Sequence, residues 1–521
     1  MMLLFATAVF SCSLPQATER FPAIPDQDAR HYELALHVDM GRRHLSGTVD
    51  YTFTALEELS TIRLDARRSA DYQVDFVDEA GRELAAEWHD DYVVLTLPEP
   101  VAKGADLRFR AQLAGMPVDG FYFRENRYGD LMAFTDHYSI RARGWLPCED
   151  HPGDRARFSA QIVYPEGMEI VGFGMPDALA SSEVEVPDGY QAVAWTGQSE
   201  IPPYMFALVI GPLVRVAEAG DARIADHLVY RQDRDKAASA LVNHAAWMGA
   251  MEQAFGDYPY GKYTTVQCPT RWGGFEAPGN VQLAESLFDR EERGQGVLAH
   301  ELVHMWFGDA VGYAQWREVW LSEGFASYFG PWLHAQTGGP QLRDSMVSMR
   351  DRWARSFEGR TKTIRDDGFP HPDQALNSNT YPKGAWVLHM LRAELGDELF
   401  FQALRSYFER FRGQSVTTDQ FVRCLEESTG RELRSFFSQW LDRVGCPELR
   451  VQPEDGAIVI EQVQKGEPYR CWLRLRWRDA SGELVERRVR LEQRRARIEV
   501  EGEVRDLQVD PDVELLFRRA G

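Results

Sequence analysis

Hydrophobic and polar residues alternate with a period of two through the first part of the chain. Three runs carry apolar side chains at every second position: Tyr32, Leu34, Leu36 and Val38; Val49, Tyr51 and Phe53; and Leu107, Phe109, Ala111 and Leu113. Half-buried β-strands produce this alternation. Glycine-containing turns, such as residues 79–81 and 101–104, separate such runs. Residues 23–215 are therefore predicted to form an N-terminal β-domain.

A helical pattern then replaces the alternation. In residues 233–256 the apolar side chains recur at helical spacing, and Gly256 follows as a C-cap. Residues 385–395 form another amphipathic stretch, which Gly396 stops. Patterns of this kind continue to about residue 442, so residues 216–445 are predicted to form a mainly helical domain.

The end of the chain returns to alternation. Apolar and basic residues alternate over residues 473–478. The apolar positions are Leu473, Leu475 and Trp477, and the basic positions are Arg474, Arg476 and Arg478. This spacing predicts strands with one buried face. Residues 446–521 are therefore expected to form a small C-terminal β-domain, and the whole chain is predicted to be a multidomain α+β protein.

Composition and charge narrow the classes of partner. The 521 residues include 58 Lys and Arg against 80 Asp and Glu, giving a formal net charge of −22, and 44% of the residues are hydrophobic. At about 150 residues per domain, the chain can form several cores. A chain this acidic lacks the broad basic field that binds nucleic acids or anionic membrane surfaces. Nucleic acid is therefore not expected as a partner.

The six cysteines point away from cysteine chemistry. They include no CxxC pair, so a cysteine-based zinc or redox site is not expected. Cys446 and Cys471 in the C-terminal region could form a disulfide or remain two buried thiols. The sequence leaves both possibilities open.

Residues 1–22 have the features of an export leader. The apolar run over residues 3–10 is too short to cross about 30 Å of hydrocarbon and suits a secretory segment better. The stretch VFSC, ending at Cys12, resembles a bacterial lipobox, so a lipid anchor on Cys12 is possible. We expect export to the periplasm, and a cytoplasmic location if the leader is not a signal. No other segment suggests a transmembrane span.

The stretch LAHELVHMWFGD, residues 298–309, has the spacing of a zinc site. Positions i and i+4 lie on one face of a helix, so His300 and His304 can present two imidazole nitrogens to one ion. Glu301 can then face a water at the open position of the metal. Glu323, 19 positions after His304, lies in the apolar stretch WLSEGFASY, where an unpaired carboxylate would be costly. One Zn²⁺ per chain, held by His300, His304 and Glu323 in a thermolysin-like arrangement, is the prediction.

A glycine-rich loop upstream, RWGGFEAPGN, surrounds a single acid, Glu276. Glycines and a proline around one carboxylate favour a tight loop that holds it in place. A solvated loop acid is the commoner case. Periodicity does not decide between the two.

Taken together, the glycine-rich loop, the H-E-x-x-H motif and an acid after eighteen intervening residues resemble the M1 family of zinc aminopeptidases. The resemblance extends to four further stretches: GWLPCEDHPGD (144–154), MEQAFGDYPYGKY (251–263), YPKGAWVLHML (381–391) and FFSQWLDRVGCP (436–447). It covers nearly the whole chain after the leader. It implies a saddle-like N-terminal β-domain, a thermolysin-like catalytic domain and the short bacterial form that lacks a long helical C-terminal domain.

The resemblance also implies roles for particular residues. Glu276 matches the glutamate of a G-x-M-E-N loop that binds the free α-amine of the substrate, and the preceding residues of that loop contact the substrate: Gly273, Gly274 and Phe275. Phe275 and Ala277 depart from the family pattern. Tyr381, 58 residues beyond Glu323, matches a tyrosine that stabilises the oxyanion. Family members also use a glutamine or glutamate from the N-terminal domain, for which Asp136 is the nearest acid here.

The predicted function is therefore a zinc-dependent aminopeptidase that hydrolyses the first bond of peptides with a free α-amine. In the mechanism that the resemblance implies, Glu301 is the general base for a zinc-activated water. Two alternatives stay open. A zinc endopeptidase on the same scaffold would make Glu276 a bystander, and a non-catalytic peptide-binding module would use the fold without the chemistry.

Overall fold

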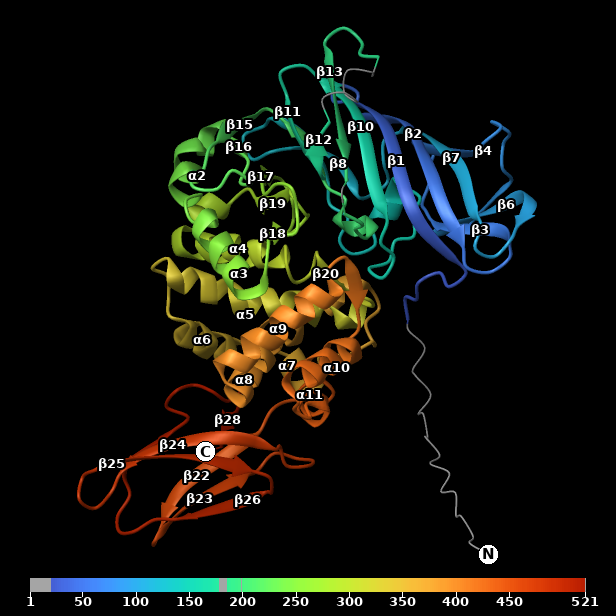
Figure 1. Ribbon diagram of the computed structural model, residues 1–521. Coiled ribbons are helices and arrows are strands. Elements are labelled where there is room, and N and C mark those ends of the chain that lie inside the picture. The colour runs from blue at the N-terminus through green and yellow to red at the C-terminus, as the bar shows by residue number, and fades with distance from the viewer. Residues whose placement is uncertain (1–19, 178–184, 198, 521) are drawn as a thin grey trace, which may run out of the picture.

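The computed structural model describes residues 20–177, 185–197 and 199–520. Cys12 and nearly all of the predicted leader lie outside these residues. Figure 1 shows a β-sheet domain in blue and cyan, a helical domain in green to orange, and a red β-domain at the far end of the helical domain. The predicted α+β organisation is confirmed. Within the described residues, no helix has both the length and the apolar character needed to cross a membrane.

A seven-stranded sheet forms the main layer of the N-terminal domain. Its strands, in spatial order, are β12 (Met175–Pro176), β13 (Tyr190–Thr196), β10 (Arg157–Pro165), β1 (Gln27–Asp39), β2 (His44–Ala55), β7 (Asp106–Gly115) and β4 (Tyr72–Asp78). Only the β1–β10 pair is parallel among these described strands. The alternating apolar residues of β1 and β2 are buried, as their period of two predicts.

Two smaller sheets complete this domain. Their strands are β11 (Glu169–Gly172), β14 (Leu208–Gly211), β9 (Leu131–Thr135) and β8 (Phe121–Glu125) in one, and β3 (Leu59–Asp65), β6 (Tyr92–Val101) and β5 (Ala86–Trp88) in the other. The segment that follows β9 turns toward the helical domain. Its residues 136–141 make polar contacts with Trp272 and Asp373 of that domain. This segment therefore brings part of the N-terminal domain to the site described below.

A five-stranded sheet lies beside helices α2–α4 of residues 234–304 (Figure 1), in a region for which the sequence predicted mainly helices. Its strands, in order, are β15 (Leu213–Val216), β16 (His227–Tyr230), β17 (Thr265–Cys268), β19 (Val281–Ala284) and β18 (Gly274–Phe275). Every residue of β16 and β17 is buried, so the period-two signal disappears from the sequence. The predicted division between residues 215 and 216 falls inside β15.

The helices pack beside this sheet. They are α2 (Arg234–Ala240), α3 (His244–Phe255), α4 (Glu291–His304), α5 (Trp320–Gln336), α6 (Leu342–Arg355), α7 (Glu358–Thr361), α8 (Gly384–Leu395), α9 (Asp397–Phe411), α10 (Thr418–Thr429) and α11 (Arg434–Leu441). The helical stretch predicted over residues 233–256 is broken into α2 and α3. Gly256 and Gly396 follow α3 and α8 with positive φ angles, as expected of helix-ending glycines.

Glycines set the spacing of the helices that carry the site. A Cβ on Gly330 of α5 would lie 3.1 Å from the Cα of His300 in α4. A Cβ on Gly324 would lie 3.1 Å from the Cα of Gly384, where α8 begins. Backbone therefore touches backbone at both crossings. Side chains on α4, on α5 and just before α8 are brought to one place.

Two small sheets form the C-terminal domain. They contain β26 (Arg495–Glu499), β23 (Ala457–Gln462), β22 (Glu448–Glu454) and β28 (Arg518–Arg519), and β25 (Leu484–Leu491), β24 (Cys471–Arg478) and β27 (Arg505–Val509). Strand β24 buries the predicted apolar face. Cys446 and Cys471 are both buried free thiols, so the possible disulfide between them is not formed. Arg490 pairs with Glu394 of α8 at 3.1 Å and ties this domain to the helices.

Candidate active site

His300, His304 and Glu323 converge as the sequence predicts. The two histidines lie one turn apart in α4, with their Nε2 atoms 3.1 Å apart. Oε2 of Glu323, from α5, is 3.2 Å from Nε2 of His300 and 3.5 Å from Nε2 of His304. Three donor atoms on two crossing helices therefore point at one small space.

The donor set fits a zinc ion. Nitrogens at tetrahedral positions about 2.0–2.1 Å from zinc would lie about 3.3 Å apart, close to the observed spacing. His304 also belongs to a second close group with Glu276 and Glu301, whose donor atoms all lie within 4.8 Å of one another. Burial lowers the pKa of His304, but the carboxylates around it, Glu276 foremost, raise it to about 10. The pocket thus favours positive charge where the donors meet.

Residues behind His304 fix which nitrogen faces this space. Nδ1 of His304 lies 3.3 Å from the carbonyl oxygen of Phe307 and 3.0 Å from Oγ of Ser322. A carbonyl only accepts, so Nδ1 carries the proton and the lone pair of Nε2 is free for a metal. Gly308, with φ at +128°, admits this packing, because a Cβ there would lie 2.4 Å from Oγ of Ser322.

Replacing Ser322 with alanine is expected to lower zinc affinity by about 10–100-fold, because it removes a partner that orients His304. Competition with a coloured chelator would measure the zinc dissociation constant directly. Ser327 lies in the same helix, and Ser327→Ala, which leaves His304 untouched, is the matched control. Equal zinc affinity in the two variants would contradict the orienting role.

Tyr381 lies at the edge of the same group. It belongs to a single π-helical turn, η7 (Asn379–Lys383), immediately before α8. Its hydroxyl donates to Oε1 of Glu323 at 2.6 Å, and its ring stacks on that of His300 at 6.1 Å between centroids. The contact between Gly324 and Gly384 allows this approach. Tyr381 therefore presents a phenol next to the predicted metal ligands.

Glu301 is oriented by a glycine in the upstream loop. A Cβ on Gly274 would lie 2.2 Å from Oε1 of Glu301, so the carboxylate packs on bare backbone. Burial raises the pKa of Glu301 well above its ordinary value, and Glu276 adds to this effect. The glutamate is thus held in the pocket on the side of the glycine-rich loop.

The loop places Glu276 inside the pocket. Gly274 and Phe275 form β18 and pair with β19, while the carbonyl of Gly273 accepts from the backbone N–H of Ala284 at 3.1 Å. Glu276 is only 7% exposed, and burial raises the pKa of its carboxyl. The charge of Glu276 contributes to the raised pKa of four tyrosines, which are Tyr138, Tyr204, Tyr313 and Tyr381. Glu276 is thus a buried pocket acid, which excludes the solvated loop acid.

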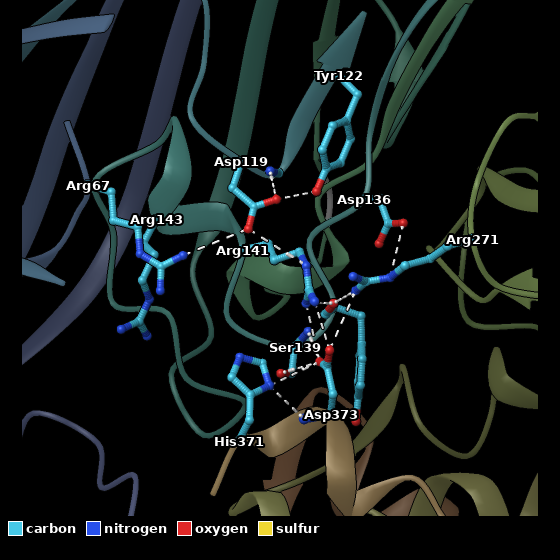
Figure 2. Close-up of polar contacts among 12 residues, drawn as sticks. Arg67, Asp119, Tyr122, Asp136, Ser139, Arg141, Arg143, Arg271, His371 and Asp373 are labelled. Carbon is cyan, nitrogen blue, oxygen red and sulfur yellow. Dashed lines mark hydrogen bonds and ion pairs between the residues drawn. The ribbon is translucent and has the colours of Figure 1, made fainter. Parts of the chain in front are cut away.

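Asp136 supports the loop from the N-terminal domain. Its Oδ1 accepts from Nε1 of Trp272 at 3.0 Å, and its Oδ2 lies 3.4 Å from Oγ1 of Thr270 and 3.7 Å from Nε of Arg271 (Figure 2). All three partners directly precede the glycines of the loop. The acid nearest to the family position therefore contacts the base of the loop.

A second buried cluster contains two histidines and a glutamate: Glu218, His227 and His244. Glu218 accepts from His244 at 2.7 Å and from His227 at 3.2 Å. The backbone N–H of Thr265 donates to Nδ1 of His227 at 3.3 Å. Nδ1 is therefore the acceptor, Nε2 carries the proton, and His227 has no lone pair directed at Glu218. Hydrogen bonds to Glu218 and Thr265 therefore account for both ring nitrogens of His227.

Comparisons with known proteins agree with this geometry. The peptidase M1 N-terminal domain model matches residues 28–205, and the peptidase family M1 domain model matches residues 240–440. Aminopeptidase M1-D of Oryza sativa subsp. japonica is 27% identical over 84% of this chain and 52% of its own length. Aminopeptidase M1 of Arabidopsis thaliana is 26% identical over 83% of this chain and 52% of its own length. The chain spans about half the length of these curated relatives.

Solved structures match at similar identity. A mutant of an M1 zinc metallopeptidase from Deinococcus radiodurans is 28% identical, with a TM-score of 0.67, covering 82% of this chain and 96% of that chain. A mutant of the same description bound to a Tyr-Ser-Ala substrate is 27% identical, with a TM-score of 0.67, covering 80% of this chain and 95% of that chain. The two family models account for both large domains, and the fold agrees with the solved structures. The chain belongs to peptidase family M1.

Proposed function

We propose that the protein is a zinc aminopeptidase that removes the first residue of peptides with a free α-amine. One observation carries the proposal: a buried carboxylate, Glu276, lies beside the donor group of His300, His304 and Glu323. When Glu276 binds the α-ammonium of a peptide, the first peptide bond, about one residue away, would lie at the metal. The names of the relatives, which are aminopeptidases and zinc metallopeptidases, support the same assignment.

His300, His304 and Glu323 would hold one zinc ion per chain. When bound, zinc supplies Lewis acidity and lowers the pKa of a coordinated water. Glu301 is the residue placed to accept a proton there, since it lies beside His304 without belonging to the His300–Glu323 group. Its burial and raised pKa suit a base that must later give the proton to the leaving amine.

Glu276 and Tyr381 would act on two different groups of the first residue of the substrate. Glu276 offers a buried carboxylate to the α-ammonium, a charge-assisted contact that a blocked N-terminus does not make. The Tyr381 hydroxyl, 2.6 Å from Glu323, would donate a hydrogen bond to the developing oxyanion. Each rival function leaves one residue of the site without a role. An endopeptidase does not need the buried carboxylate of Glu276, and a binding module does not need Glu301 as a base.

A panel of chromogenic aminoacyl amides, assayed with and without a chelator, tests the proposal. We expect hydrolysis of free aminoacyl amides, loss of activity with the chelator and recovery with zinc. The N-acetylated amides should not be cleaved. Equal cleavage of acetylated and free substrates would favour the endopeptidase, and stoichiometric zinc without any hydrolysis would favour the binding module.

A further inference from the structure

A polar cluster joins the two large domains next to the pocket. Figure 2 shows it between the segment after β9, the base of the glycine-rich loop and the short helix η6 (Pro372–Ala375). We call it the bridging cluster and define it by five residues: Asp136, Ser139, Arg141, Arg271 and Asp373. Three segments that are far apart in sequence therefore share one set of polar contacts.

Within the bridging cluster, Asp373 binds the N-terminal domain through both of its carboxylate oxygens. Its Oδ1 accepts from the backbone N–H of Ser139 at 3.1 Å and from Oγ of Ser139 at 2.8 Å. Arg141 binds it through both terminal nitrogens, at 3.2 Å to Oδ1 and 2.8 Å to Oδ2. Burial would raise the pKa of Asp373, but hydrogen bonds from Arg141 and Ser139 outweigh this effect and hold it below its ordinary value. The carboxylate is thus a fixed anionic anchor between domains.

Asp373 connects to Tyr381 through a short, hydrogen-bonded stretch. The backbone N–H of Asn377 donates to Oγ1 of Thr380 at 3.0 Å, and Thr380 donates to the carbonyl of Ala375 at 2.9 Å. The backbone N–H of Tyr381 donates to the carbonyl of Asn377 at 3.2 Å. Few free torsions remain between η6 and η7. A shift of Asp373 would therefore be transmitted to the phenol.

The bridging cluster also contacts Tyr138, which forms part of the pocket wall. The carbonyl of Tyr138 accepts from Arg141 at 2.7 Å and from Arg271 at 2.5 Å. The Tyr138 ring stands edge-on to that of Trp272, with centroids 5.9 Å apart, and Trp272 also donates to Asp136. Arg141 therefore holds both Tyr138 and Asp373, and Arg271, at the base of the Glu276 loop, contacts Tyr138 and lies 3.9 Å from Asp373.

We propose that Asp373 is a positioning residue, which sets Tyr381 against the N-terminal domain so that the phenol and the Glu276 loop keep a fixed separation. This inference rests on the proposed aminopeptidase function. Asp373 acts through Tyr381 and touches no reacting atom. Its removal should therefore affect the rate of the chemical step more than the binding of substrate.

Asp373→Asn keeps the size of the side chain but loses the charge that Arg141 binds at two points. We expect kcat for an aminoacyl amide to fall on the order of ten-fold, with KM and zinc content little changed. In a Tyr381→Phe background, the same substitution should lower kcat by about two-fold or less, because residues that act as one unit are not additive. Glu394→Gln, which removes an ion pair with Arg490 between the helical and C-terminal domains, is the matched control and should leave kcat unchanged.

Hydrogen exchange gives a readout that does not depend on activity. Amides of residues 379–383 should exchange several-fold faster in Asp373→Asn than in wild type, and at the wild-type rate in Glu394→Gln. Arg141→Lys, which keeps the charge but not the two-point contact, should show the same pattern in milder form if Asp373→Asn folds poorly.

Two results would overturn the positioning role: unchanged exchange in residues 379–383, or an undiminished loss of kcat in the Tyr381→Phe background. An inactive wild type that still shows the exchange difference would refute the proposed function and leave the positioning role supported. An active wild type, together with an Asp373→Asn variant whose kcat and hydrogen exchange are unchanged, would refute only the positioning role.

Discussion

Glu301→Gln is expected to lower kcat for a free aminoacyl amide by about 10²–10⁴-fold while one zinc ion stays bound per chain. Glutamine has the same shape, so it can occupy the space over Gly274, but it accepts no proton. Glu301 also lies outside the group formed by His300 and Glu323, so metal binding should survive. Steady-state kinetics together with zinc analysis of the purified variant would measure both quantities.

Glu318→Gln provides the matched control for this substitution. Glu318 is 2% exposed and Glu301 is 4% exposed, but Glu318 bonds to Thr418 and takes no part in the pocket group. We expect its kcat to stay near that of wild type. A Glu301→Gln variant that keeps kcat within a few-fold of wild type, or that loses its zinc, would contradict the assignment of Glu301 as the base.

Glu276→Gln is expected to reduce kcat/KM for free aminoacyl substrates by roughly 10–150-fold. The figure corresponds to about 1.5–3 kcal/mol for a hydrogen bond to a charged group. The loss should appear mainly in KM, because the anchor contacts an ammonium that is charged both before and during the reaction. Zinc content should not change. Initial-rate measurements across a range of substrate concentrations would separate KM from kcat.

A substrate that lacks the α-amine distinguishes this role from a general structural one. The des-amino substrate should be poor for wild type and equally poor for Glu276→Gln, because the missing contact is the same in both cases. If the variant is impaired on the des-amino substrate as strongly as on the free amine, Glu276 supports the fold of the pocket and does not bind the amine.

The metal donors were the most predictable part of the site. The spacing of His300 and His304 alone places them on one face of a helix, and an acid inside the apolar stretch around Glu323 needs a partner. Strands β1, β2 and β7 of the N-terminal domain were predictable for a similar reason, since their buried residues alternate with more exposed ones. Local periodicity is sufficient in both cases.

Features that depend on tertiary contact were not predictable. Ser322 is one serine in an apolar helix, and only the fold shows that it faces Nδ1 of His304. The strands β16 and β17 are buried on both faces, so no alternation marks them. Asp373 lies in the short helix η6, which no periodicity marks in the sequence, 234 positions from its partner Ser139. Small residues beside a predicted ligand, such as Ser322 and Gly324 next to Glu323, were the one local sign in the sequence of close packing around the metal donors.

The glycine crossings make the donor distances independent of the size of the surrounding side chains. In most helix pairs the interaxial spacing follows the volume of the residues at the contact, so each substitution there moves both backbones. Gly330 against His300 and Gly324 against Gly384 replace that variable layer with main-chain atoms. Substitutions elsewhere in the core can then accumulate without changing the distance from α4 to α5. The aromatic core around this site can therefore change in composition without moving the donor atoms that α4 and α5 carry.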